Sequence, residues 1–139
     1  MIQDVITRLE TAAPSLAAVL SAEDIDALTK GTAPKSGTVF VMPYRERAEE
    51  NPFASGKFRQ LVHVQLLTAL VIRRHDDTKG GGKAVSFDTR KLEIETALAG
   101  WSSDPRNKPF ELVAGQAASL GNGASVYVQT WQTTRYLEN

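Results

Sequence analysis

The sequence predicts an α+β fold: a mostly antiparallel sheet of about four strands, with helices packed on one of its faces. Apolar residues recur at helical spacing in two separated segments, residues 2–13 and 86–99, and alternate in the segments between and after them. The two helical patterns do not alternate regularly with the strands, as they would in a doubly wound sheet. The chain has 139 residues and no internal repeat or linker, so we expect a single domain, residues 1–139.

The first element is an amphipathic helix over residues 2–13, which ends before Pro14. Its apolar face is made by Ile2, Val5, Ile6 and Leu9, with Ala12 and Ala13 continuing it. Ser21 followed by Asp24 is typical of a helix start, so a short second helix is expected at about residues 22–29.

Two strands follow. Residues 38–44 are expected to form a strand with alternating faces, and Pro43 either ends this strand or marks it as an edge strand. Residues 58–73 form the longest strand candidate. One of its faces is apolar throughout, whereas the other carries His63 and Gln65 before it becomes apolar. We therefore expect this strand to be covered on both faces over only part of its length.

The C-terminal half contains a helix over residues 86–99 and then two strands at 109–116 and 124–137. The apolar stripe of the helix comprises Phe87, Ile94, Leu98 and Trp101, with Leu92 beside it. Gly100 stands where a left-handed C-terminal cap is expected. In the last strand Val126 and Val128 face one way, and Tyr127, Gln129 and Trp131 face the other.

The composition excludes several classes of protein. Sixteen basic and sixteen acidic residues give no net charge, which argues against a dedicated nucleic-acid binder. The chain has no cysteine, so disulfides, thiolate metal sites and cysteine catalysis are excluded. No apolar run reaches the length of about 18 residues that a membrane span needs, and the first residues do not resemble a signal peptide.

No motif calls for an enzyme or a cofactor. His63 alternates with apolar residues and is expected to be structural or at the surface. The cluster Arg73–Asp77, which contains His75, lies in a polar loop that does not preorganise ligands or catalytic groups. The stretch TKGGGK lacks the spacing and the hydroxyl residue of a phosphate loop. We therefore expect no catalytic, cofactor-binding or metal-binding residues.

Two polar segments are candidates for contacts with other proteins. Residues 44–57 are expected to form a charged loop, and its candidate interface residues are Arg45, Arg47, Glu49, Phe53 and Lys57. Arginine and aromatic anchors are enriched at protein interfaces, but an ordinary mobile loop explains the composition equally well. Arg73 and Arg74 are further candidates, at the start of a glycine-containing loop, residues 73–83, that we expect to be mobile in the free subunit.

Trp101 follows directly after the glycine that ends the second long helix. We expect its ring to fold back on Leu98 and Ile94, and to seal the sheet where the strand begun by Pro109 and Phe110 starts. The role expected for Trp101 is therefore structural.

The same region, residues 97–133, resembles the C-terminal half of the tail terminator (tail completion, minor tail protein U-like) group of small tailed-phage proteins. In that group a helix ends in a Leu-x-Gly-Trp-like motif, and a loop, a strand, a turn and a last strand with aromatic residues follow. The matching positions are Leu98, Gly100, Trp101, Pro105, Phe110, Gly115, Val126, Tyr127, Val128 and Trp131. Trp131 stands where a phenylalanine is common, and the glycines at 80–82 have no counterpart. Upstream, the helix, the strand entry at Pro34–Pro43 and the long strand follow in the same order.

The resemblance implies a structural virion protein with no catalysis and no cofactor. It implies a homo-oligomer, usually a hexameric ring, on the head-proximal end of the tail tube, where it stops tube growth and joins the head. The implied partners are the tail tube protein and a head–tail connector protein, without nucleic-acid sequence recognition or a membrane. The implied place is the virion tail, after assembly in the host cytoplasm. The alternatives are a different head–tail connector, a tail-tube or baseplate subunit, and a small ligand-binding or enzymatic α+β domain.

Overall fold

The computed structural model describes residues 1–30, 34–73 and 81–139 of the chain. Within these residues it has two α-helices, a short 3-10 helix and five strands, in the order α1 (Ile2–Ala12), β1 (Ala18–Ser21), η1 (Ile25–Thr29), β2 (Thr38–Ala48), β3 (Arg59–Arg73), α2 (Gly81–Leu98), β4 (Glu111–Ser119) and β5 (Ala124–Glu138). The predicted α+β class is confirmed.

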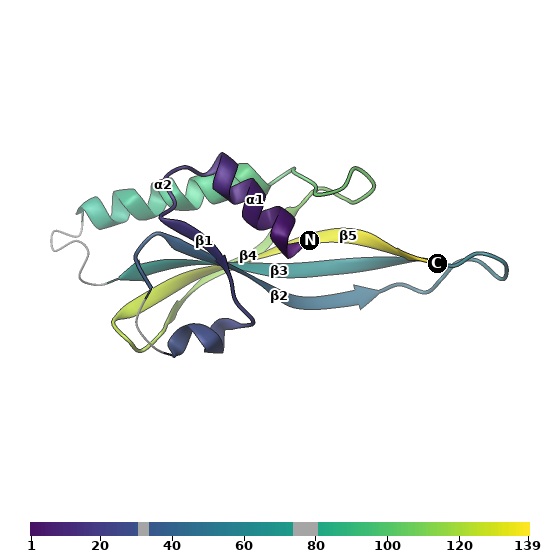
Figure 1. Ribbon diagram of the computed structural model, residues 1–139, viewed down its shortest axis with the longest axis horizontal. Coiled ribbons are helices and arrows are strands. Elements are labelled where there is room, and N and C mark those ends of the chain that lie inside the picture. Colours follow the sequence, from purple (N-terminus) through teal and green to yellow (C-terminus); the bar gives the residue numbers. More distant parts are fainter. Residues whose placement is uncertain (31–33, 74–80) are drawn as a thin grey trace.

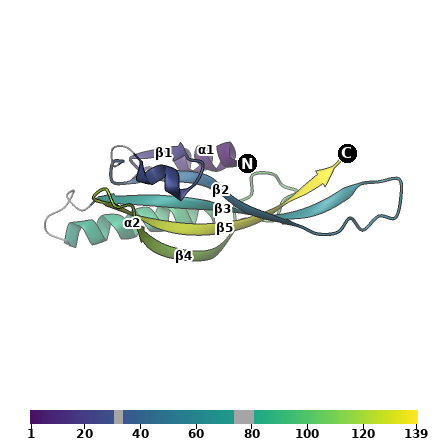
Figure 2. The ribbon, with the colours of Figure 1, turned by 90° about the horizontal axis from the view of Figure 1, so that it is seen from below.

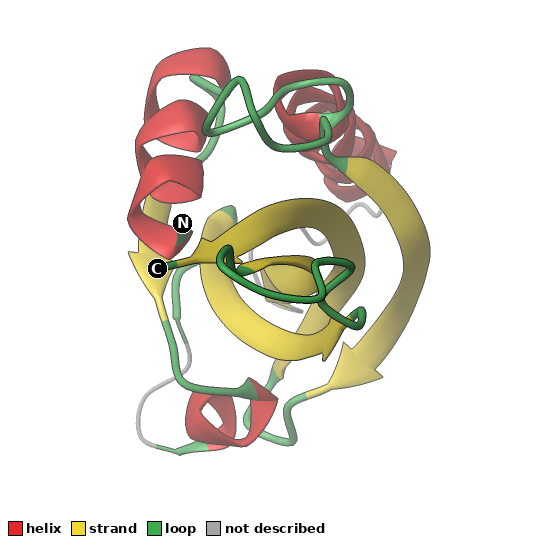
Figure 3. Cartoon of the chain, turned by 90° about the vertical axis from the view of Figure 1, so that its right-hand side faces the viewer, coloured by secondary structure: helices red, strands yellow, loops and turns green. Residues whose placement is uncertain are grey.

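The strands form one mixed sheet in the order β1-β2-β3-β5-β4. All neighbouring strands are antiparallel except β1 and β2, which are parallel. The two α-helices lie on one face of the sheet and η1 lies on the other (Figure 1 and Figure 3). The strands β2, β3 and β5 extend beyond the helices at one end (Figure 2). The sheet therefore has a covered body and an uncovered extension.

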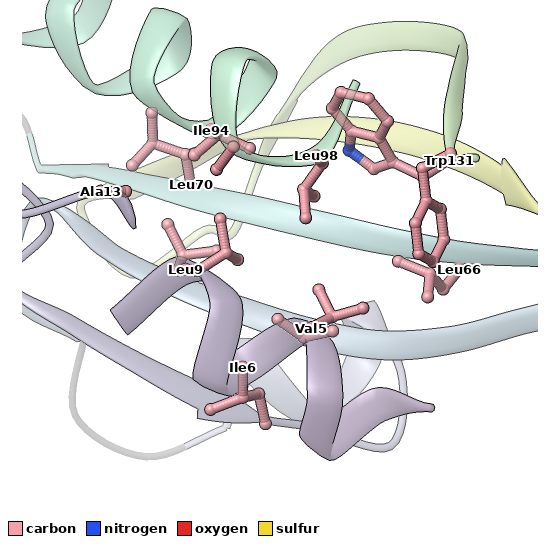
Figure 4. Packing of buried hydrophobic residues seen from close by; sticks show 13 residues of the cluster. Val5, Ile6, Leu9, Ala13, Leu66, Leu70, Ile94, Leu98 and Trp131 are labelled. Carbon is pink, nitrogen blue, oxygen red and sulfur yellow. The ribbon is translucent and has the colours of Figure 1, made fainter. Parts of the chain in front are cut away.

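The core on the helix side joins both helices to the sheet (Figure 4). Its buried side chains come from one face of each helix, from the three strands β2, β3 and β5, and from the loop before β4; they include Val5, Leu9, Val39, Leu66, Leu70, Ile94, Leu98, Phe110 and Trp131. The predicted packing of both helices on one face is confirmed. Leu92 is instead 62% exposed, because it lies about 200° around the helix from Ile94 at 100° per residue.

A second core lies on the opposite face, under η1. It is formed by Leu28, Met42, Leu67, Ala69, Val71, Leu120, Ala124, Val126 and Val128. As the alternation predicts, the second face of β3 is buried near Leu67 and partly exposed at His63 and Gln65. The sheet is thus covered on both faces in the body only.

The strand β1 is absent from the sequence-based prediction and is the fifth strand of the sheet in the described residues. Its four residues are too few to show an alternating pattern. They are held by parallel pairing, in which Ala18 to Ser21 lie opposite Thr38 to Val41. The expected helix at 22–29 is also shorter: Asp24 is its N-cap, accepting a hydrogen bond of 3.0 Å from the backbone nitrogen of Ala27, and η1 begins at Ile25.

The strand β2 is longer than predicted. Its pairing with β3 continues to Ala48, across an irregularity between Pro43 and Arg45. The expected charged loop, residues 44–57, is therefore a strand over its first five residues, because pairing with β3 outweighs the lack of apolar alternation. Since β1 ends beside Val41, Pro43 lies where β2 has become an edge strand, which is the second alternative for this proline.

The segment between β3 and α2 differs from the expected mobile loop, residues 73–83. Arg73 is the last residue of β3, and α2 begins at Gly81 and not at Ser86. The rest of that prediction concerns residues 74–80, including His75, which lie outside the described residues.

The end of α2 agrees with the prediction for Gly100 and Trp101. Gly100 has φ of +81°, the left-handed region that favours glycine. Its backbone nitrogen donates to the carbonyl oxygen of Phe110, and the nitrogen of Phe110 donates to the carbonyl oxygen of Trp101. The rings of Trp101 and Phe110 are stacked, with their centroids 5.9 Å apart. Trp101 is partly buried against the helix-side core, which also contains Leu98, so the aromatic pair closes the turn that leads into β4.

Candidate assembly surface

Among the described residues, no group of three or more histidine, cysteine, aspartate or glutamate side chains could hold a metal ion. His63 approaches one carboxylate, that of Glu49, and both side chains are partly exposed. No helix in the described part of the chain is long and apolar enough to cross a membrane.

The most prominent surface is the hairpin that extends beyond the helices (Figure 1). We call residues 43–66 the arm: the outer parts of β2 and β3 and the connecting loop at 49–58. The final residues of β5 pair with it, up to Glu138 opposite Arg59. The side chains of β2 in the arm are exposed and available to other molecules, whereas Val62, Val64 and Leu66 of β3 are buried.

One face of the arm carries a polar groove of about 350 Å³, lined by Arg45, Glu46, Arg47, His63, Gln65 and Gln132. Nε of Arg45 donates a 2.8 Å hydrogen bond to Oε1 of Gln65, whose amide donates to Oε1 of Gln132 at the same distance. Arg47 lies opposite His63 across the β2–β3 pair and is exposed. Three strands therefore share one network that holds Arg45 in place.

An ion pair joins the edge strand of the arm to β5. Arg135 donates from Nε and one terminal nitrogen to the two carboxylate oxygens of Glu46, at 2.9 and 3.0 Å. These hydrogen bonds lower the pKa of the Glu46 carboxyl and raise the pKa of Arg135. A bidentate pair of this kind has a defined geometry, so it fixes the orientation of β2 where β1 no longer supports it.

The base of the loop is held by Glu49. Its carboxylate lies 2.6 Å from Nε2 of His63, and its backbone nitrogen donates to the carbonyl oxygen of Leu61. The Glu49 side chain is therefore engaged inside the arm, which reduces its value as a contact to another protein.

The tip of the arm presents Phe53, which is 42% exposed. Asn51 organises the tip, because its side-chain oxygen accepts from the backbone nitrogens of Phe53 and Arg59 at 3.5 and 3.3 Å. The guanidinium of Arg59 lies 4.0 Å from the centroid of the Tyr136 ring. Phe53, Arg59 and Tyr136 line a shallow hollow of about 200 Å³. Lys57 lies in the same loop and is exposed.

The structure brings five of the seven candidate interface residues together on the arm: Arg45, Arg47, Glu49, Phe53 and Lys57. Arg73 is at the opposite end of β3, fourteen residues beyond Arg59, or about 46 Å along an extended strand at about 3.3 Å per residue. Arg74 lies outside the described residues. Arg73 thus does not join the surface made by the first segment.

Sequence reasoning missed the residues that support this surface from β3 and β5. Gln65, Arg135 and Tyr136 contact the arm only because the register of three strands places them there. Asn51 had a local signal, since asparagine before proline often starts a turn.

The helices cover the sheet face that carries Tyr127, Gln129 and Trp131. The exposed fraction is 0% for Trp131 and 2% for Gln129. The side-chain nitrogen of Gln129 donates to Oε2 of Glu95 on α2 at 2.8 Å. The ring of Tyr127 meets that of Phe87 edge to face at 5.3 Å. This face is therefore core and not an interface.

Comparison with known proteins supplies the wider context. The model of a family described as phage tail terminator protein matches residues 1–139, the whole chain. Among solved structures, a chain described as part of the virion of a native gene transfer agent particle has a similar fold. Its TM-score is 0.56 and the identity is 14%, over 97% of this chain and 92% of that one. At this identity the likeness is one of fold. No curated protein matches the chain significantly.

Proposed function

Since the chain belongs to the phage tail terminator protein family over its whole length, we propose that its copies form a ring on the head-proximal end of the tail tube. The ring stops polymerisation of the tube and offers the surface to which the filled head joins. A hexamer is the form that the sequence resemblance implies. A member of this family is a structural component of the virion tail and not an enzyme.

The observation that carries the proposal is the match of the family model to every residue of the chain. The fold is consistent with it, because the similar solved chain is part of a virion particle. The sequence-level alternative of an enzymatic domain is excluded by the family.

The arm supports a role in contacts along the tail. It extends beyond the helices at one end of the molecule (Figure 2), which lets it reach a neighbouring subunit or the tube. Arg45 and Arg47 can pair with carboxylates of a partner, and Phe53 offers an apolar anchor of the kind found at interface centres. The partners of the proposed ring are the tail tube protein on one side and a head–tail connector protein on the other. It assembles in the host cytoplasm.

The function can be tested by making phage tails without this protein. A terminator predicts tubes that grow beyond their normal length and do not join heads, as electron microscopy of lysates would show. Restoring the wild-type chain should restore both length and head joining. Complete absence of tubes would contradict the proposal and identify a tube subunit. Tubes of normal length that fail only to join heads would identify a neighbouring connector.

A further inference from the structure

Both ends of the sheet are free. The strand β4 pairs only with β5, and β1 pairs only with β2, so in the described part of the chain no strand covers the outer edge of either. Backbone N–H and C=O groups on such edges are a template for pairing with another strand. Neither the proposed contacts of the arm nor the family assignment accounts for these two free edges.

The edge at β4 lacks most of the usual protection against pairing. Residues 112–119 contain no charged residue and no proline, although lysine, proline and bulges are the common means of blocking an edge. The protection consists of an irregularity between Leu112 and Ala114. All residues of β4 except Ala118 are exposed, and Leu112 and Val113 are exposed by 46% and 50%. This is an edge suited to a partner.

The edge at β1 has the same character. Residues 15–22 are uncharged, and Leu20 is 48% exposed. The free part of β2 beyond β1 differs, because it carries Pro43, Arg45 and Arg47 and is thereby blocked. Uncharged strands with free backbone hydrogen-bonding groups therefore lie at the two outer edges of the sheet, and not along the arm.

The directions of the strands match between the two edges. Along the sheet β1 and β2 run one way, β3 the other way, β5 the first way and β4 the other way. A second copy that continues the sheet in the same sense places its β1 beside β4 of the first copy. The two strands then run antiparallel, like three of the four pairs within the chain.

We propose that β4 of one copy pairs with β1 of the next copy, so that the sheets of neighbouring subunits join around the ring. The inference rests on the proposed ring, because a ring of more than two copies needs two different surfaces in each contact. A chain without net charge does not oppose this approach of identical copies. Pairing of β4 with β4 would instead close a dimer and leave both β1 strands free.

The flank of α2 above β4 extends this surface. Nε of Arg90 donates a hydrogen bond to the carbonyl oxygen of Ser15, near α1. Lys91, by contrast, lies over the Tyr127 ring of β5. The flank with Lys91 therefore faces the β4 side of the sheet.

Engineered cysteines test the contact directly, because the chain has none of its own. Leu20→Cys on β1 and Val113→Cys on β4 alter side chains that are half exposed, so the subunit should still fold. Tails assembled from the double variant are treated with a short bis-maleimide and separated under denaturing conditions. We expect a ladder of linked chains that ends at the ring stoichiometry. Each single variant should give only unlinked chains under the same denaturing conditions.

A linked dimer from Val113→Cys alone would overturn the inference in favour of β4–β4 pairing. If the double variant gives tails of normal length but no ladder, the inference is overturned too, while the proposed terminator function still stands. Failure of the proposed terminator function has a different readout. In that case, tails made without the protein would not be over-long.

A charge placed on the edge gives a second measurement. Val113→Lys should abolish capping and give over-long tubes, while the circular dichroism spectrum and melting temperature of the purified variant stay unchanged. Thr96→Lys, at an exposed position of α2, is the matched control and should cap tubes normally. Normal capping by Val113→Lys would overturn the inference.

Discussion

The indole nitrogen Nε1 of Trp131 donates a hydrogen bond to the hydroxyl oxygen Oγ1 of Thr68 at 3.1 Å. Both side chains are buried, with exposed fractions of 0% and 1%. They lie on β5 and β3, on the sheet face that the two helices cover. This contact explains how the largest buried side chain keeps its single polar group satisfied inside an apolar core.

Thr68→Val should therefore destabilise the protein although it preserves volume. It leaves a buried N–H donor without its acceptor, at a cost of about 1–3 kcal/mol. Urea unfolding followed by Trp fluorescence measures the loss. In the double variant Thr68→Val, Trp131→Phe the two costs should be less than additive, because the donor is gone as well. Additive costs would show that the hydrogen bond contributes nothing.

Trp101→Ala should cost about 2–3 kcal/mol. This is below the range of about 3–5 kcal/mol for fully buried aromatic residues, because Trp101 is only partly buried. The loss comes from the stacked contact with Phe110 and from the Arg8 guanidinium, which lies 5.6 Å from the ring centroid. Trp101→Phe is the control and should retain most of the stability in chemical denaturation. A loss for Trp101→Ala below about 1 kcal/mol would assign this ring to assembly instead.

Gly115→Ala should destabilise the β4–β5 pair. A Cβ at this position would lie 2.6 Å from the hydroxyl oxygen of Tyr127, and that ring is held by its edge-to-face contact with Phe87. We expect a loss of about 1–3 kcal/mol, typical of overpacking, in thermal or urea unfolding. Adding Tyr127→Phe removes the nearest atom and should recover part of the loss. No recovery would mean that the ring carbons of Tyr127, of which Cζ would lie 3.1 Å and Cε1 3.2 Å from the added Cβ, cause the loss.

The Glu46–Arg135 pair should make a small, pH-dependent contribution to stability. The pKa of Glu46 is lowered from its ordinary 4.5 by the hydrogen bonds from Arg135, so the contribution is present above pH 4.5 and is lost as the pH falls through the lowered value. Because the pair is partly exposed, Glu46→Gln should cost no more than about 1 kcal/mol at pH 7. The difference from wild type in urea unfolding should shrink as the pH falls below 4.5 and the Glu46 carboxylate is protonated. Glu10→Gln on α1 is the control, and a difference for Glu46→Gln that persists in acid would contradict the assignment.

The arm should be dispensable for folding and required for assembly. Reversing the charges of Arg45 and Arg47 to glutamate together with Phe53→Ala changes side chains outside both cores, so the melting temperature should stay within a few degrees of wild type. Tail capping, seen as tube length by electron microscopy, should be lost. If the triple variant yields tails of normal length, the arm is a solvated hairpin, and the edges at β4 and β1 carry the contacts.

The sequence by itself determined the elements whose side chains repeat over many residues. The helical spacing of α1 and the alternation of β3 and β5 each follow from burying one face against a core, so they can be read locally. Gly100 and Trp101 were also readable, because a left-handed cap and an aromatic ring after it are local features. These elements were sufficient to predict the α+β class and to state the family resemblance.

Only the tertiary structure decided the elements that depend on a neighbouring strand. The four residues of β1 and the outer half of β2 have no periodicity of their own and exist because another strand supplies their hydrogen bonds. For the same reason the sequence pointed to Arg45 and Arg47 but not to Gln65 or Arg135, which reach the arm through the register of three strands. Sheet pairing joins residues distant in sequence, so the free edges and the arm appear only when the strand order is known.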